Sequence, residues 1–242
     1  MKRNSIELSK RMQMVADMVT KGNVAADIGC DHGFVSIYLI EQGICPKVIA
    51  MDVNEGPLLR AKEHVSERGL DKKIDIRLSD GIDKLMEKEA DSIFIAGMGG
   101  RLVIKILSDH FDRVRELKEV ILQPQSELHL VRRFLKEQGM SIVQEDMVEE
   151  AGKYYPCMKA VRKEQKAEYT ELEEWYGPLL LEQRHPVLYQ FLLKEKNMFA
   201  QIAEDIRKNA KCGVAEDIKA ENIQKRIGQI SMALSYYGEQ EA

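Results

Sequence analysis

The segment Val24–Phe34, with the sequence VAADIGCDHGF, sets the fold of the first half of the chain. It opens with an apolar run typical of a buried strand, and a helical pattern begins at Phe34. Gly29 and Gly33 lie between the two, where glycine lets the backbone approach a ligand and the helix start offers unpaired N–H groups. The stretch therefore predicts a strand–loop–helix unit with a ligand at its loop.

The same alternation continues for about a hundred residues. Four further strand-like runs each lead into a turn and a helical pattern: Val48–Met51, Ile74–Leu78, Ser92–Ala96 and Val120–Leu122. Two more strand candidates follow with only the turn-like EEAGKYYP between them: Met140–Val148 and Cys157–Val161. Crossover helices require parallel strands, and a short turn requires antiparallel ones. We expect an α/β fold with a mostly parallel, Rossmann-like sheet and an antiparallel edge hairpin.

The composition changes after Arg162 and divides the chain into two predicted domains, residues 1–162 and 163–242. Strand-like runs stop there. Apolar residues recur at helical spacing behind Pro186, and later at the alternating four and three of a heptad seam. Gly213 lies in the polar segment between the two stripes. This part is predicted to form an α-helical hairpin or coiled coil whose stripes pack as core.

Composition limits the classes of function. The chain has 242 residues and a formal net charge of -4, so no global positive field attracts nucleic acid, and a local patch is needed for such binding. No apolar run is long enough to span a bilayer. The four cysteines are scattered without metal-ligand spacing: Cys30, Cys45, Cys157 and Cys212. We expect a cytoplasmic protein without a structural metal or disulfides.

The glycine loop distinguishes two kinds of ligand. A dinucleotide fingerprint needs a third glycine where Asp31 stands, and a pyrophosphate would meet that carboxylate as a like charge. A cationic ligand without phosphates, such as S-adenosylmethionine, suits the acids instead. Asp27 is placed to reach its amino-acid end, Asp52 its ribose and Asp80 its adenine edge. Each acid alone is equally explained as a helix cap or turn residue, but three at consecutive strand ends indicate a binding site.

The fourth strand ends in IAGMGG, Ile95–Gly100. Its glycines clear space beside the methyl donor, although a tight strand-to-helix turn also explains them. An Asn/Asp-Pro-Pro-aromatic motif, which accepts hydrogen bonds from an exocyclic amine, is absent from the sequence. The segment therefore favours a methyl acceptor other than an amine.

Seven segments together resemble the bacterial tRNA adenine-N1 methyltransferases that modify A22: LSKRMQMVADMV, DIGCDHG, DVNEGPL, LSDGI, IAGMGG, LQPQ and YYP. The resemblance covers nearly the whole chain, including the C-terminal helical hairpin. It implies a class I methyltransferase fold, S-adenosylmethionine as the methyl donor and tRNA as the acceptor. The expected reaction is methylation of N1 of adenosine 22.

The candidate site residues fall into three groups. The donor is expected to lie against residues at the first four strand ends: Asp27, Gly29, Cys30, Gly33, Asp52, Val53, Asp80, Gly81 and Gly97. N1 of neutral adenine has a free lone pair, so we expect catalysis from alignment and from groups beside the cationic product: Asp31, Gly97, Met98 and Gly99. Contacts to tRNA are expected from basic and aromatic side chains: Arg11, His32, Arg132, Arg133, Tyr154 and Tyr155.

Each group has a plainer explanation. A lone loop histidine such as His32 is more often a packing residue at a helix start, and the tyrosines in the final hairpin are equally well explained as edge-strand packing. Basic runs usually form a solvated face, including the other candidates for phosphate contact: Lys2, Arg3, Lys10 and Lys136. Two other classes of function stay open from the residues alone. One is a nicotinamide-dependent oxidoreductase, although the third glycine of the dinucleotide-binding motif is missing from this sequence. The other is a non-catalytic nucleic-acid-binding or adaptor protein that works through the coiled coil.

Overall fold

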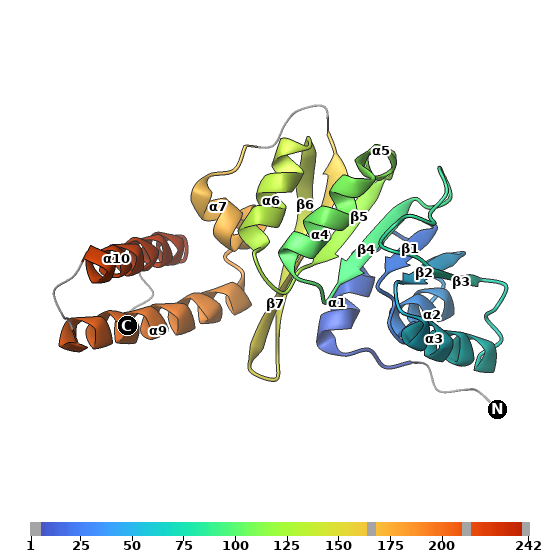
Figure 1. Ribbon diagram of the computed structural model, residues 1–242, viewed down its shortest axis with the longest axis horizontal. Coiled ribbons are helices and arrows are strands. Elements are labelled where there is room, and N and C mark those ends of the chain that lie inside the picture. Colours follow the sequence, from blue (N-terminus) through green and yellow to red (C-terminus); the bar gives the residue numbers. More distant parts are fainter. Residues whose placement is uncertain (1–5, 164–167, 210–213, 239–242) are drawn as a thin grey trace. The chain divides into compact units, whose positions relative to one another are not determined.

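The computed structural model describes residues 6–163, 168–209 and 214–238. The chain divides into two compact units, Met1–Glu168 and Tyr169–Ala242. A seven-stranded sheet forms the centre of the first unit (Figure 1). Its strands are β1 (Ala25–Ile28), β2 (Val48–Asp52), β3 (Ile74–Leu78), β4 (Ser92–Ala96), β5 (Glu119–Gln123), β6 (Met140–Glu150) and β7 (Lys153–Arg162).

The strands are ordered β3-β2-β1-β4-β5-β7-β6. The first five are parallel to their neighbours, and β7 runs antiparallel to both β5 and β6. From β1 the chain continues toward β2 on one side, and from β4 it continues toward β5 on the other side. The connections after these two adjacent strands therefore lead away in opposite directions. Ligands of open parallel sheets bind at such a point. The predicted mostly parallel sheet with an antiparallel hairpin at its edge is confirmed.

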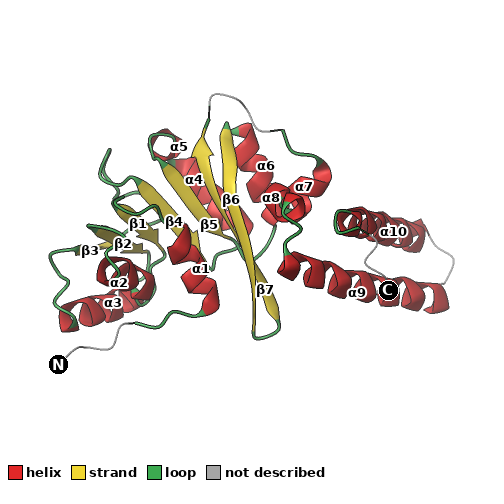
Figure 2. Cartoon of the chain, turned by 180° about the vertical axis from the view of Figure 1, so that it is seen from behind, coloured by secondary structure: helices red, strands yellow, loops and turns green. Residues whose placement is uncertain are grey.

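Helices cover both faces of the sheet, because crossovers between parallel strands must pass over a face. The helices α1 to α3 lie on one face and α4 to α6 on the other (Figures 1 and 2). Buried Phe94 of β4 belongs to the core shared with α1 to α3, and its neighbours Ile93 and Ile95 point to the opposite face. The bounds are α1 (Lys10–Met18), α2 (Phe34–Glu41), α3 (Glu55–Glu67), α4 (Gly100–Asp109), α5 (Phe111–Val114) and α6 (Leu128–Glu137).

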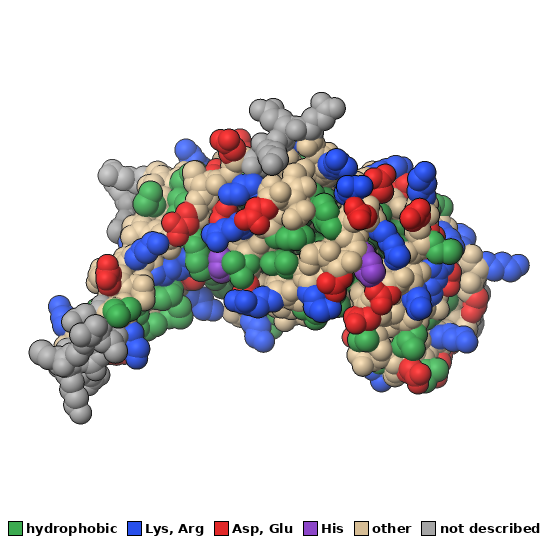
Figure 3. All heavy atoms as spheres, turned by 45° about the horizontal axis from the view of Figure 1, so that its top comes forward, with side chains coloured by type: hydrophobic (Ala, Val, Ile, Leu, Met, Phe, Trp, Pro, Cys, Tyr) green, Lys and Arg blue, Asp and Glu red, His purple; other side chains and the backbone are tan. Residues whose placement is uncertain are grey.

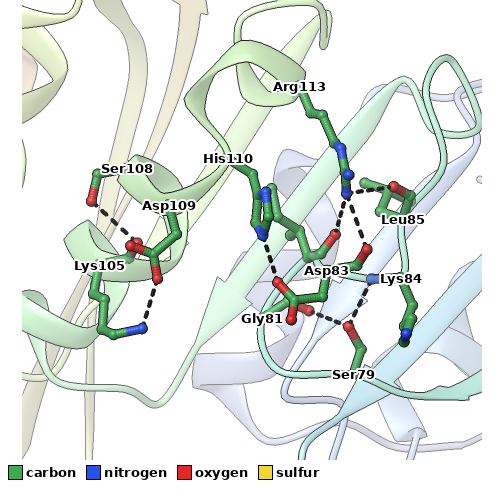
Figure 4. A network of polar contacts seen from close by, with 11 residues as sticks. Ser79, Gly81, Asp83, Lys84, Leu85, Lys105, Ser108, Asp109, His110 and Arg113 are labelled. Carbon is green, nitrogen blue, oxygen red and sulfur yellow. Dashed lines mark hydrogen bonds and ion pairs between the residues drawn. The ribbon is translucent and has the colours of Figure 1, made fainter.

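One predicted helix is absent. After β3 the described chain turns through residues 79–91 without helical structure, so the expectation of a helix in the third unit is wrong. Figure 4 shows why the backbone stays in turns. The Ser79 hydroxyl donates to the Gly81 carbonyl (3.1 Å) and accepts from the Lys84 N–H (3.1 Å). Arg113 of α5 donates to carbonyls that a helix would otherwise use, those of Ile82, Asp83 and Leu85.

The final hairpin is longer than predicted. Its turn consists of Ala151 and Gly152 alone, with φ of 52° and 77°. Two-residue hairpin loops favour positive φ at both central positions, because that twist matches the flanking strands. Tyr154 and Tyr155 therefore lie in β7, and their predicted place in the turn is wrong.

The second unit is helical, as expected. It contains α7 (Glu171–Tyr176), α8 (Pro178–Glu182), α9 (Pro186–Asn209) and α10 (Val214–Ser235). The last two helices pack against each other, with Leu188 and Leu192 of α9 and Ile230 of α10 buried. Pro186 opens α9, as its position predicted, whereas Gly213 falls outside the described residues. The pattern did not predict α7, which begins with a capping box formed by Thr170 and Glu173.

Arg226 of α10 links the helices within this unit. Its guanidinium lies 4.1 Å from the ring centroid of Trp175 and 5.1 Å from that of Tyr176, both in α7. The same group donates to the carboxylate of Glu195 in α9 at 3.2 Å. One cationic side chain thus contacts two neighbouring helices through a cation–π stack and an ion pair.

Candidate active site

The loop after β1 is tied to the end of β2. The Gly29 N–H donates to the Met51 carbonyl (2.8 Å), and the Asp31 N–H donates to the carboxylate of Asp52 (3.3 Å). Three of its residues have positive φ: Gly29 (76°), Asp31 (48°) and Gly33 (71°). The two glycines therefore serve a sharply turned loop, and Asp31, where a third glycine was missing, adopts the same left-handed region.

Asp27 is a nearly buried carboxyl at the end of β1. Its side chain is 5% exposed and accepts a hydrogen bond from the Ser36 hydroxyl at 2.6 Å. Burial raises the pKa of Asp27 to about 7, Ser36 opposes the shift, and the charges of Asp52 and Asp31 add to it. The carboxyl is therefore poised between its two forms near neutral pH. A cation at this position would favour the ionised form.

Asp52 is held rigidly at the end of β2. One carboxylate oxygen accepts from the Asn54 N–H (2.9 Å) and the other from the Asp31 N–H. Each oxygen keeps a second lone pair for an outside donor, such as a hydroxyl. Two apolar side chains flank this position, Val53 (59% exposed) and Leu78 (50% exposed), and Leu78 pairs with Asp52 across the sheet. They offer an apolar surface for a flat ring.

Leu78 is not among the residues predicted from the sequence. Its signal was an apolar residue at the last position of a strand, directly before the LSDG turn that holds Asp80 and Gly81. Asp80 is exposed, as a ligand contact requires. Gly81 turns the chain with φ of 53°, and a Cβ there would lie 3.1 Å from the Ile106 side chain of α4. Its role in the structure is therefore a close packing contact as well as a turn.

The loop after β4 is bonded to the loop after β5. The Gly97 N–H donates to both the backbone and the side-chain oxygen of Gln123 (3.1 and 3.2 Å), and the Gly100 N–H donates to the Ser126 carbonyl (3.1 Å). A Cβ on Gly100 would lie only 2.4 Å from that carbonyl oxygen. Part of the IAGMGG pattern is thus required by close backbone approach between the two loops.

Met98 brings the two glycine loops into contact. A Cβ on Gly29 would lie 2.2 Å from the Met98 methyl carbon, so the loop after β1 and the loop after β4 touch at this point. Gly97 and Gly99 on either side of Met98 are exposed. Asp31 projects outward, with its side chain 67% exposed and 3.6 Å from the His32 ring. Gly29, predicted to contact the donor, and Met98, predicted on the acceptor side, are therefore neighbours.

Arg11 and Tyr155 lie together on the other side of the loop after β4. Arg11 of α1 donates to the Gln123 side-chain oxygen (3.2 Å), and its guanidinium lies 5.5 Å from the Tyr155 ring centroid. A Cβ on Gly97 would lie 3.4 Å from the Arg11 Nη1 atom. Tyr154 points to the opposite face of β7, because successive strand residues alternate. The sequence predicted the two residues separately, and the fold brings them into one cation–π contact.

One predicted tRNA contact is wrong. Arg132 is 1% exposed, and its Nε donates to the buried carboxylate of Glu145 at 2.9 Å. It lies on the inner face of α6 with Val131 and Leu135, so it cannot reach a phosphate. The neighbouring Arg133 faces outward and remains a prediction. Lys2 and Arg3 fall outside the described residues.

His32 belongs to a stack of three rings. Its ring lies 5.5 Å from that of Phe34 with an angle of 8° between their planes, and Phe34 lies 4.8 Å from His64. The His64 ring also approaches the His32 carbonyl at 3.0 Å. Phe34 is 43% exposed, so the stack presents a flat aromatic surface beside the loop after β1. A substrate contact by His32 stays a prediction.

Other features of the described residues lie away from this chemistry. The described thiols are buried, which raises the pKa of Cys45 to about 12 and those of Cys30 and Cys157 further, so they are not thiolates at neutral pH. Cys212 lies outside the described residues. The described residues contain no cluster of three or more metal-binding side chains. Among the described helices, none has the length and apolar character needed to cross a membrane.

Charges are mixed on the face of the molecule shown in Figure 3. Lys and Arg side chains alternate with Asp and Glu side chains there, and no large area carries a single sign. This agrees with the slightly negative net charge of the whole chain. On this face, a contact with an anionic polymer would therefore come from individually placed groups and not from a broad basic surface.

Comparisons with known proteins agree with this geometry. A family model described as a methyltransferase domain matches residues 8–158. The chain is 35% identical over 194 residues to the tRNA (adenine(22)-N(1))-methyltransferase of Bacillus subtilis, covering 80% of this chain and 78% of that protein. It is also similar to the crystal structure of the B. subtilis M1A22 tRNA methyltransferase TrmK (TM-score 0.85, 29% identity, 94% and 99% coverage). A further similar structure is the putative tRNA (m1A22) methyltransferase of Streptococcus pneumoniae in complex with S-adenosyl-L-methionine. Its TM-score is 0.84 and its sequence identity 30%, and the match covers 94% of this chain and 100% of that chain.

Proposed function

The chain belongs to the bacterial tRNA (adenine(22)-N1)-methyltransferase family, and from this membership we propose that it methylates N1 of adenosine 22 in tRNA with S-adenosylmethionine as donor. The observation that carries the proposal is the contact between the loops after β1 and β4 at Gly29 and Met98. This contact joins the loop after β1, which lies among acidic residues suited to a cationic donor, to the loop after β4, in which Gly97 and Gly99 are exposed. The alternative readings as an oxidoreductase or an adaptor have no support in the comparisons.

The residues present fit the donor. S-adenosylmethionine supplies an electrophilic methyl group on a sulfonium. Asp27, buried and with its pKa raised to about 7, is suited to the ammonium of the amino-acid end. Asp52 has lone pairs for the ribose hydroxyls, while Val53 and Leu78 are placed to flank the adenine, with Asp80 beyond them. Gly29 and Gly33 keep the intervening backbone close.

The chain needs no general base for this reaction. N1 of neutral adenine attacks with its own lone pair, so the protein's contribution is to align acceptor and donor. The exposed Gly97 and Gly99 leave room on the acceptor side, next to Met98. The methylated ring is cationic, and the outward-facing Asp31 is placed to stabilise that charge.

Contacts to tRNA are assigned to Arg11, His32, Arg133, Tyr154 and Tyr155. Arg11 adjoins the exposed Gly97 and stacks on Tyr155, and the Phe34 stack adjoins the loop after β1. Aromatic faces commonly hold bases extruded from folded RNA, and guanidinium groups bind phosphates. An enzyme that acts on tRNA is expected in the cytoplasm, which fits the unpaired thiols described above.

The direct test is to incubate the full chain with unmodified tRNA and S-adenosylmethionine and to identify the methylated nucleoside by mass spectrometry. We expect 1-methyladenosine, and none from a tRNA whose position 22 is guanosine. N6-methyladenosine would contradict the proposal if found under conditions that exclude rearrangement of the N1 product. The loop after β4 carries no side chain that accepts from an exocyclic amine, which is why we expect the N1 isomer.

We also propose a division of labour between residues 1–162, which bind the donor, and residues 163–242, which help to engage tRNA. Every donor residue named above precedes Arg162, and a folded tRNA needs a wider footprint than one nucleotide. A chain that ends at Arg162 should bind S-adenosylmethionine normally but bind and methylate tRNA weakly, with a shallower salt dependence. Circular dichroism must first show an intact fold. Normal tRNA methylation by this shortened chain would reject the division.

A further inference from the structure

Gln123, the last residue of β5, has an unusual hydrogen-bond pattern. Its side chain is fully buried, and its Oε1 accepts from both the Arg11 Nη1 and the Gly97 N–H, each at 3.2 Å. Because both partners are donors, the amide cannot be flipped. Its Nε2 then has no partner among the described residues. Folded proteins rarely leave a buried amide N–H unpaired, so an outside acceptor is expected nearby.

Arg11 has a similar deficit. Within the described part of the chain no carboxylate lies in ion-pair reach of its guanidinium, whose contacts are Gln123 and the face of Tyr155. A guanidinium has five N–H donors in a planar fork, and most of them are unused here. The group stands beside Gly97, where the absence of a side chain leaves it open. Arg11 is thus a cation aimed at the loop after β4 without an anion of its own.

We propose that Arg11 and Gln123 form an oxyanion-binding subsite at the carboxyl ends of β4 and β5. Arg11 binds the anion with its planar fork, which matches carboxylate and phosphate geometry. Gln123 fixes the guanidinium through its Oε1 and offers its unpaired Nε2 to the same anion. The inference rests on the proposed function, in which two groups carry such an oxyanion: the carboxylate of the donor's methionine and a phosphate of the tRNA backbone.

Charge balance explains why an anion is needed at this point. The proposed reaction brings a sulfonium to the loop after β4 and leaves a cationic base there. An uncompensated guanidinium at that loop would raise the energy of both, since like charges repel strongly in a desolvated site. A ligand oxyanion on Arg11 removes this penalty. The second oxygen of the same carboxylate or phosphate can accept from the otherwise unpaired Gln123 Nε2.

The test uses the full chain and binding measurements that need no turnover. Arg11→Met removes the cation, and Arg68→Met is the matched control, because Arg68 pairs with Glu41 away from the site. Calorimetry compares S-adenosylhomocysteine with methylthioadenosine, which lacks the carboxylate. If the anion is the donor's carboxylate, Arg11→Met weakens S-adenosylhomocysteine binding about 10- to 100-fold and spares methylthioadenosine. If it is a phosphate, both ligands are spared and the salt slope of tRNA binding falls by about one.

Gln123 is tested through its coupling to Arg11. Gln123→Leu should weaken binding of the same ligand by a smaller factor, and the loss in the double variant should be smaller than the two single losses combined, because both residues bind one anion. Gln123→Glu, which is nearly isosteric, should also weaken binding because its carboxylate takes the anion's place. Additive losses in the double variant would overturn the binding of one anion by both residues. Affinities of Arg11→Met and Gln123→Glu within twofold of the unmodified chain, for both donor product and tRNA, would overturn the subsite.

These outcomes are separable from the proposed function. A failure of the unmodified chain to form 1-methyladenosine would reject adenosine 22 as the acceptor, while the calorimetric comparison of the two small ligands would still report on Arg11. Conversely, normal methylation together with unchanged affinities in the variants would reject the subsite alone.

Discussion

The carboxyl ends of β1 to β3 and those of β4 and β5 form one edge of the same sheet, yet their chemistry differs. The first half carries Asp27, Asp52 and Asp80, with the exposed apolar side chains of Val53 and Leu78 beside them. The second half carries amides, glycines and the guanidinium of Arg11. The difference shows how one edge can hold a cationic ligand at one end and present its reactive part to an electron-rich acceptor at the other.

The two halves are also held in different ways. In the first, neighbouring carboxylates repel one another, and burial raises the pKa of Asp27 to about 7. This half is therefore completed by a positive ligand. In the second, the loops are joined by hydrogen bonds between Gly97 and Gln123 and between Gly100 and Ser126, and the unmatched charge is positive. Each half lacks the charge that the other carries in excess.

The largest expected effect comes from removing the buried acid of the first half. Asp27→Asn keeps the size of the side chain but cannot ionise, so donor affinity at pH 8 should fall by about 3 kcal/mol, or about 100-fold. Calorimetric titration measures this. Affinity for tRNA should not change. Asp17→Asn, an exposed acid on α1, serves as the control. Equal losses of donor and tRNA affinity would show that the two halves do not act separately.

An intermediate effect is expected from pH. In the proposed site the donor pairs with the ionised form of Asp27, whose pKa is raised to about 7, so donor affinity should be constant above that pH and fall about tenfold per unit below it. In the donor-free chain, the free energy of unfolding changes in the opposite direction with pH. The pKa of Asp27 is 3.8 in the unfolded chain and about 7 in the folded one, so between these values only the folded chain keeps the proton. The stabilisation from this group is therefore lost as pH rises from 3.8 to about 7.

The control for both pH effects is Asp27→Asn, which should bind the donor with a flat profile and lose less stability between pH 6 and 8. Thermal unfolding and calorimetry at matched ionic strength give the two profiles. An unchanged slope in this variant would assign the titration to a group other than Asp27.

The smallest effect is expected in the second half. Tyr155→Leu removes the ring under Arg11, a contact worth about 0.5–1 kcal/mol at an exposed position, so tRNA methylation at saturating donor should fall about two- to fivefold. Tyr155→Phe keeps the ring face and should be nearly normal. A Phe variant as slow as the Leu variant would point to the tyrosine hydroxyl in place of the ring.

Periodicity and turn chemistry predicted most of the fold, because each strand and helix is decided by its own residues. The exceptions depend on partners elsewhere. Residues 79–91 stay in turns because Arg113, about thirty positions later, takes their carbonyls. The final hairpin was predicted too short because Tyr-Tyr-Pro resembles a loop, whereas the positive φ of Ala151 and Gly152 alone closes it.

The site was predictable to the extent that strand ends define it. Asp27 and Asp52 were predicted to share one edge because parallel strands bring their carboxyl ends together, and the structure has both there. Arg132 was misassigned, since its burial depends on Glu145 thirteen residues away and on which side of α6 faces the sheet. Gln123 was missed altogether. Its partners come from α1 and from the loop after β4, and a single glutamine in a sequence carries no sign of them.

The position of Trp175 has a practical consequence. It is the only tryptophan in the chain, and it lies in the second unit with the Arg226 guanidinium 4.1 Å from its ring. Intrinsic fluorescence excited at the red edge of the absorption band therefore reports on the helical unit alone, and circular dichroism reports on both units. A denaturation curve followed by the two signals together would show whether the units unfold as one or in sequence, without any label attached to the protein.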